Sequence, residues 1–301
     1  MKKNKKMQLN TKLFVRLIMY ILLIDFAFIY LYPFLYMIIT ALKTPDDLMD
    51  ISVNWVLNKV HFENFKQAFN LLEYFPRFLK TVLSTALCTA GHVLSCSFIG
   101  YGFARYKFRG KNLFFSFLLL SMIVPTQTII VPLYILYSKL GMIPGHMAII
   151  LPTWFGFGLK GALFVFIFRQ FFLSLPPALE EASAIDGCGA IQTFFRIALP
   201  IAKPTVIVCS VFSTVWHWND LFEPTLYIKK QKGFYLSLIL PTIQSLVEKA
   251  ESGAAEGADY SYTNATVMAT AVLIILPLFI GYMFIQKKFV QSIETSGITG
   301  E

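Results

Sequence analysis

The chain has 301 residues, of which 56% are hydrophobic, 16% aromatic and only 14% charged. Soluble domains contain about 45–50% apolar and about 25% charged residues, so this composition excludes an ordinary soluble domain and predicts an integral membrane protein. The net charge of +9 does not indicate a nucleic-acid-binding protein, because Lys and Arg gather at the ends of apolar runs and not on one amphipathic face.

Cysteine and histidine are scattered through the chain. The cysteines form no C-x-x-C pair, which argues against a disulfide framework and a zinc site. Neither residue type has the spacing of a nucleophile and its base or of metal ligands, which disfavours the alternative of a membrane-embedded enzyme. We expect no catalytic residue, metal or cofactor in this chain. The residues are Cys88, Cys96, Cys188 and Cys209, and His61, His92, His146 and His217.

Six stretches are long and apolar enough to cross a bilayer, which takes about 20 residues over roughly 30 Å of hydrocarbon. They are 17–41, 81–104, 113–137, 147–168, 205–228 and 267–285. The first is longer than the apolar core of a signal peptide and lacks a small-residue cleavage site, so we expect it to remain as a helix. The sequence predicts an all-α integral membrane fold with one transmembrane domain over 1–301.

The distribution of Lys and Arg predicts the orientation of this domain. Short segments rich in these residues stay in the cytoplasm, and three qualify: the N-terminus, the connection 105–111 and the tail at Lys287 and Lys288. We therefore expect both termini to be cytoplasmic. The segments 42–80 and 229–266 would lie outside, where their lysines count for less because long loops translocate largely regardless of charge.

Prolines and charges interrupt several of the predicted spans. Prolines free backbone groups that a neighbouring helix or a wet cavity must satisfy, so they favour a transport pathway, with ordinary packing kinks as the alternative. We expect two basic residues to reach the inner surface, whereas one acidic residue lies too centrally and needs a partner. The prolines are Pro33, Pro125, Pro132, Pro224 and Pro277. The two basic residues are Lys160 and Arg169, and the acidic residue is Asp25.

The segment 174–203 is a polar, acidic island between two apolar spans. Ser174 and the prolines that follow suit the start of a helix, and Glu181 lies near the positive end of its dipole. Gly187 can take the positive φ that ends this helix. A second short helix would then run to Ile197 and stop before Pro200. The sequence predicts a helix-turn-helix at the cytoplasmic membrane surface.

Polar residues in the fifth span are the best candidates for a solute path, because such residues are costly in a membrane and usually face a cavity or each other. Trp216, Asp220 and Glu223 follow the spacing of one helix face. Carboxylates, amides and aromatic rings suit the hydroxyls and apolar faces of a sugar. The alternative is contact with a partner subunit or the membrane interface. The candidates are Trp216, Trp218, Asn219, Asp220 and Glu223.

The chain carries no G-x-x-x-x-G-K-[ST] loop for ATP. A single G-x-G-x-x-G match, at Gly156, Gly158 and Gly161, lies inside an apolar span with no preceding strand, so a dinucleotide site fails its structural test. We expect these glycines to allow close helix packing instead.

The island has the spacing E-A-x4-G-x9-I-x-L-P, which resembles the EAA loop of the permease subunits of bacterial ATP-binding-cassette importers. The surrounding sequence resembles the second, six-helix subunit of the maltose-type sugar permease family, and the resemblance covers nearly the whole chain. The motifs outside the loop are Lys43-Thr44-Pro45-Asp46, Asn64-Phe65, Ala104-Arg105-Tyr106-Lys107-Phe108-Arg109-Gly110-Lys111 and Trp218-Asn219-Asp220-Leu221-Phe222-Glu223-Pro224.

This resemblance implies that the loop docks on a cytosolic ATPase. Glu181, Ala182 and Gly187 would form the docking core beside Asp186, and Ser183 stands where the family has its second alanine, with a slight effect on partner fit. The residues implied to fix the loop to the membrane domain are Ile185, Ile197, Leu199 and Pro200.

The resemblance also implies the other components. They are a second, different permease subunit, an ATPase dimer that carries ATP and Mg, an extracytoplasmic solute-binding protein, and membrane lipid around the bundle. The expected function is half of the path for a mono- or oligosaccharide across a bacterial plasma membrane. An importer of the same architecture for a non-sugar solute, such as a phosphorylated polyol, is the alternative.

Overall fold

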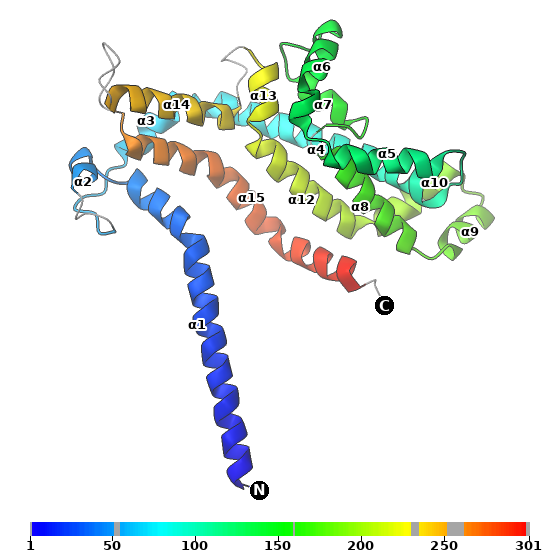
Figure 1. Cartoon of the computed structure of the whole chain (residues 1–301), viewed down its shortest axis with the longest axis horizontal. Helices are drawn as coiled ribbons and strands as arrows, with labels where there is room; N and C mark the ends of the chain where they lie inside the picture. Colours follow the sequence, from blue (N-terminus) through cyan, green and yellow to red (C-terminus); the bar gives the residue numbers. More distant parts are fainter. Residues whose placement is uncertain (1, 51–54, 159, 230–234, 252–261, 299–301) are drawn as a thin grey trace. The chain divides into compact units, whose positions relative to one another are not determined.

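The structure is a computed structural model that describes residues 2–50, 55–158, 160–229, 235–251 and 262–298 (Figure 1). All regular secondary structure in these residues is helical, which confirms the predicted all-α fold. Parts of the predicted outer segments 42–80 and 229–266 lie outside the described residues.

The helices of the described residues are, in chain order, α1 Lys2–Ala41, α2 Pro45–Met49, α3 Glu63–Leu71, α4 Tyr74–Arg105, α5 Lys111–Ile123, α6 Thr126–Lys139, α7 Met147–Thr153, α8 Gly161–Ser174, α9 Ala178–Ile185, α10 Ala190–Thr193, the π-helix η1 Phe194–Ala198, α11 Leu199–Ile201, α12 Lys203–Asn219, α13 Phe222–Tyr227, α14 Leu236–Glu251 and α15 Asn264–Ile298.

The chain divides into two compact units, Met1–Leu71 with Ile243–Leu273, and Leu72–Thr242 with Ile274–Glu301. In the first unit, Ala41, Ala68 and Ala269 form a small buried core. Asn64 Nδ2 donates to the carbonyls of Ala41 and Lys43 at 2.9 and 2.8 Å, which fixes the chain as it leaves α1. The Asn64 motif therefore has a structural role.

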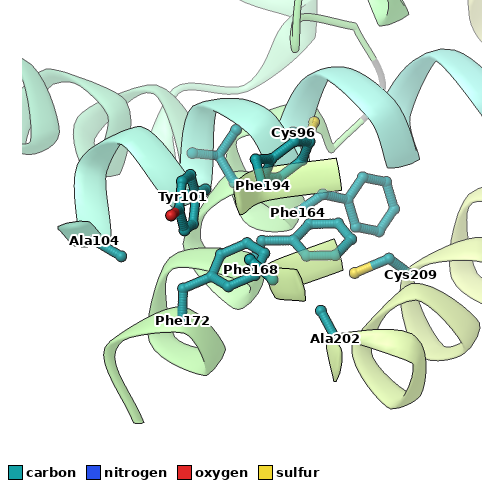
Figure 2. Packing of buried hydrophobic residues seen from close by; sticks show 11 residues of the cluster. Cys96, Tyr101, Ala104, Phe164, Phe168, Phe172, Phe194, Ala202 and Cys209 are labelled. Atoms are coloured by element: carbon teal, nitrogen blue, oxygen red, sulfur yellow. The ribbon is translucent and has the colours of Figure 1, made fainter. Parts of the chain in front are cut away.

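An aromatic core holds the second unit together. Phe164, Phe168 and Phe172 of α8 are fully buried against Cys96 and Tyr101 of α4, and Figure 2 shows their side chains between these helices. Since lipid tails are as apolar as phenylalanine, removal from water does not hold such helices together in a membrane. The core is stabilised by close packing of side chains and backbones.

Gly100 lies at a close approach of α4 and α8 in this core. A Cβ there would lie 2.8 Å from Phe168 Cβ and 2.9 Å from the Arg169 backbone nitrogen, and backbone atoms do not yield. Helix propensity favours alanine over glycine by about 1 kcal/mol. Overpacking of a tight core costs about 1–3 kcal/mol and should outweigh it.

Gly100→Ala is therefore expected to lower the thermal midpoint of the purified protein in detergent. Gly102→Ala is the matched control on the same helix, because no heavy atom lies within 4 Å of the Cβ that it would add. Equal thermal midpoints for the two variants would contradict the close approach of α4 and α8.

Three helices are long and apolar enough to cross a membrane: Lys12–Ala41, Tyr74–Arg105 and Asn264–Ile293. Three further pairs of shorter helices reach that criterion together but bend between their members, so the described residues hold up to six spans if each pair counts as one. The number of six spans and the single domain over 1–301 stay predictions.

The prediction that prolines interrupt the helices is wrong at three positions. Helices α1, α6 and α15 continue through Pro33, Pro132 and Pro277, which transmembrane helices tolerate because neighbouring groups satisfy the freed carbonyls. The chain does break at Val124 and Pro125, where α5 and α6 meet at 106° and Val124 takes the extended conformation favoured before proline. The predicted span 113–137 is therefore sharply bent.

The spans predicted at 147–168 and 205–228 are also broken. Helix α7 ends at Thr153, because Gly156 and Gly158 take φ values of +71° and +98° that a helix does not allow. These two glycines make a turn, and Gly156 also packs closely against α4, since a Cβ there would lie 2.6 Å from Ile99 Cδ1. The third glycine of the motif, Gly161, is at a close approach, since a Cβ would lie 2.4 Å from the Gly156 carbonyl oxygen.

Candidate functional site

The segment 174–203 folds as a helix-turn-helix in which α9 and α10 flank the turn at Gly187 (Figure 1). Gly187 has a φ of +79°, as its place in the sequence predicts, and no atom lies within 4 Å of the Cβ that a larger residue would add. Glycine is therefore required here by the left-handed backbone and not by lack of space.

Both ends of the predicted helix-turn-helix need correction. Ser174 is the last residue of α8 and not a cap, since α9 starts after Pro177. The second helix does not stop before Pro200: it continues as η1 and α11, and the Leu199 N–H bonds to the Phe194 carbonyl, five residues back. This π-turn lets the helix continue although Pro200 has no N–H to donate.

Ser183 faces the inside of this loop. Its side chain is buried, and its hydroxyl lies 2.6 Å from the hydroxyl of Thr193 on α10, which itself donates to the Gly189 carbonyl at 3.1 Å. Ser183 therefore donates to Thr193 and braces the two helices against each other. The side chain of Ser183 is buried within the loop, and the expected slight effect of this residue on partner fit stays a prediction.

The outer face of the loop combines acidic and apolar side chains. Glu181, Ala182 and Asp186 are exposed, and Ile185 is 86% exposed. Ile185 therefore does not fix the loop to the membrane domain, in contrast to the expectation, because α9 turns it outward when Ser183 turns inward. Of the other expected anchors, Leu199 packs against the aromatic core, Ile197 is half-buried and Pro200 is exposed.

Arg105 ties this loop to the end of α4. Its Nη2 donates to the Leu175 carbonyl at 2.7 Å, and its Nε lies 2.9 Å from Glu180 Oε1. The arginine side chain is only 11% exposed, so water screens this contact less than a surface ion pair. The sequence did not predict this pair, because Arg105 stands out there only as part of the basic connection 105–111.

The polar residues of the fifth span do not share one helix face. Helix α12 ends at Asn219, and Asp220 Oδ1 accepts the Phe222 N–H at 3.0 Å to cap the next helix, α13. A short acidic side chain competes in this way with a continuous helix. Because the helix is interrupted at this point, residues with i, i+4, i+7 spacing do not lie on one helix face.

These residues consequently point to different places. Trp216 stacks against Phe164 and Phe212 at the aromatic core, with ring centroids 5.5 and 5.4 Å apart. Trp218 is buried and donates to the Ile274 carbonyl at 3.0 Å. Asn219 is exposed and bonds to the Val215 carbonyl at 2.9 Å. Only Glu223 lines a large cavity.

That cavity has a volume of about 870 Å³ and lies where the bent and broken helices meet. Its walls come from the α5–α6 bend, α7, the glycine turn, α8 and α13. Sequence reasoning missed most of its polar lining, and Lys160 had been expected to reach the inner surface. The polar side chains in the wall are Ser121, Thr126, Gln127, Tyr137, Lys160, Glu223 and Tyr227.

Two further features bear on the site. In the part of the chain that the structure describes, no group of three or more His, Cys, Asp or Glu residues could hold a metal ion. Asp25 is exposed on α1, and no partner for its carboxylate is present among the described residues.

Comparison with known proteins places these features in a family. Residues 97–295 match the family model described as "Binding-protein-dependent transport system inner membrane component". The chain is 27% identical over 277 residues to the arabinooligosaccharides transport system permease protein AraQ of Bacillus subtilis, covering 91% of this chain and 92% of AraQ. It is 30% identical over 283 residues to the probable ABC transporter permease protein YurM of Bacillus subtilis, covering 91% and 87%.

A third relative and a solved structure agree with this placement. The lactose transport system permease protein LacG of Rhizobium radiobacter is 26% identical over 265 residues, covering 88% of this chain and 90% of LacG. The fold is similar to a chain in the crystal structure of a bacterial ABC transporter involved in the import of the acidic polysaccharide alginate. The TM-score is 0.73 at 19% identity, with coverage of 91% of this chain and 95% of that chain.

Proposed function

The chain belongs to the family of binding-protein-dependent transport system inner membrane components, and from this premise we propose that it forms half of the translocation path of an ATP-driven saccharide importer. It is a transport subunit, and ATP hydrolysis belongs to a separate ATPase. The observation that carries the proposal is the exposed outer face of the loop around Ile185, braced from within by Ser183 and tied to α4 by Arg105.

The loop geometry supports docking on a cytosolic ATPase dimer. Small Ala182 and exposed Ile185 offer an apolar contact, and Glu181 offers a carboxylate to a basic group of the partner. Because the two helices of the loop are joined by the hydrogen bond of Ser183 to Thr193, a push on the outer face moves the loop as one body. The Arg105 contacts would pass that movement to α4.

The remaining components are proposed on the same grounds. A second, different permease subunit would complete the path, and an extracytoplasmic binding protein would deliver the solute. We place the protein in a bacterial plasma membrane with both termini and the loop in the cytoplasm. The Lys and Arg residues of the short segments support this orientation.

The saccharide is proposed from the relatives, whose names specify arabinooligosaccharides, lactose, and melibiose, raffinose and stachyose. In vesicles that carry this chain with its partner permease, ATPase and binding protein, we expect ATP-dependent uptake of at least one of these sugars. Vesicles without this chain are the control. Uptake of a non-saccharide solute, with no uptake of any neutral or acidic saccharide, would contradict the proposal.

A further inference from the structure

The cavity in the second unit is formed by interruptions of the helices. Helix α6 turns away from α5 (Figure 1), with an angle of 106° between them, and the glycine turn separates α7 from α8. The resulting volume of about 870 Å³ falls within the roughly 300–1,000 Å³ typical of small-molecule sites. The bends therefore leave room for a ligand beside the packed core of α4 and α8.

Glu223 is the residue of this cavity that most requires a ligand. It is 9% exposed, it lies in the cavity wall, and no hydrogen bond to its carboxylate is present among the described residues. A carboxylate in a membrane segment is costly unless it faces a partner or a wet cavity. The carboxyl oxygens of Glu223 are therefore available to accept hydrogen bonds from a ligand in the cavity.

Two tyrosines accompany Glu223 in the wall. Tyr137 and Tyr227 are 7% and 1% exposed, and their rings contact edge to face with centroids 5.5 Å apart. A buried tyrosine hydroxyl usually finds a partner, but none is present for either hydroxyl in the described part of the chain. Gln127 adds an amide that both donates and accepts.

This combination of groups fits a neutral sugar better than an acidic one. Carboxylate, amide and phenol groups match sugar hydroxyls, while Leu133 and Pro152 offer apolar surface to the faces of a sugar ring. Lys160 is exposed, so water screens its charge, and the described lining holds no buried basic side chain that could pair with the carboxylate of an acidic sugar.

We propose that this cavity is a solute subsite on this chain, in which Glu223, Tyr137 and Tyr227 hydrogen-bond the hydroxyls of a neutral saccharide. The inference rests on the proposed function of a saccharide permease. It assigns a direct part in solute contact to this subunit and narrows the class of solute.

The first test compares variants in vesicles that carry the complete importer. Glu223→Gln replaces an oxygen of the carboxyl group by an NH2 donor but keeps the size, and uptake of a neutral saccharide should fall about tenfold with the apparent affinity for the loaded binding protein unchanged. Glu248→Gln, an exposed carboxylate of α14 outside the cavity, should leave uptake unchanged. Unchanged uptake in Glu223→Gln would overturn the subsite, and uptake of an acidic saccharide in preference to a neutral one by the unsubstituted importer would overturn its neutral specificity.

The second test measures access to the cavity, and it gives a result even if no saccharide is transported. In a Cys188→Ser background, which leaves only buried cysteines, Gln127→Cys should react with a charged thiol reagent. A transported neutral saccharide should slow the labelling of Gln127→Cys but not of Thr128→Cys, whose neighbouring exposed position lies outside the cavity wall. Absence of labelling, or labelling that a transported saccharide does not slow, would overturn the subsite. Transport of no saccharide would count against the proposed function instead.

Discussion

Ile185→Asp is expected to separate the ATPase from the importer while the permease itself stays folded. Ile185 is 86% exposed, so the substitution removes almost no contact within the chain. At a docked interface the same side chain would be buried, and a charge without a partner would be strongly unfavourable there. A hot-spot residue at the centre of an interface contributes about 2 kcal/mol or more, and a loss of that size at Ile185 corresponds to roughly 30-fold in Kd.

The measurement is co-purification of the ATPase with the tagged permease, followed by titration of the ATPase to obtain the Kd. Met49→Asp is the matched control, because Met49 is also 86% exposed but lies on α2 in the other compact unit. Equal recovery of the ATPase with both variants would show that the outer face of the loop is not the docking surface.

Arg105→Ala is expected to uncouple ATP hydrolysis from transport without releasing the ATPase. The change removes the hydrogen bond to the Leu175 carbonyl and the ion pair with Glu180, which connect the loop to α4, but it leaves the outer face of the loop intact. We expect uptake to fall more than tenfold while ATPase binding persists. Arg105→Lys should retain only part of the uptake. Lysine keeps the positive charge, but its ammonium group cannot reproduce the two directions in which the guanidinium group donates.

The experiment measures uptake, ATPase rate and ATPase recovery on the same preparation. Arg109→Ala is the control, since Arg109 is an exposed arginine of the same connection. Loss of ATPase recovery in Arg105→Ala would assign a docking role to the residue. Full uptake would show that the contacts of Arg105 are not needed to transmit movement of the loop to α4.

The sequence was sufficient for features that depend on local chemistry. The apolar runs predicted an all-α membrane fold, since only helices satisfy their own backbone groups within one segment of lipid-facing chain. The positive φ of Gly187 followed from the same kind of argument, because glycine between two short helical patterns favours a left-handed turn.

Features that depend on contacts between distant residues could not be predicted in this way. Helix α9 has eight residues, and its inner face is set by the hydrogen bond from Ser183 to Thr193, ten positions further on. The family resemblance implied an anchoring role for Ile185, whereas the structure exposes Ile185 and buries Ser183. The break at Asp220 was missed for a different reason. Its side chain accepts a backbone N–H and so offers the chain an alternative to a continuous helix, and hydropathy does not measure the small difference in energy between the two conformations.

In the proposed importer, the exposed face of the loop contacts the ATPase. A photoreactive amino acid introduced at Ile185 in the assembled importer, with Met49 as the control position, tests this contact. We expect a cross-link from position 185 to the ATPase and none from position 49. Cross-links from position 185 only to lipid or to the partner permease, in an importer that retains its ATPase, would contradict it.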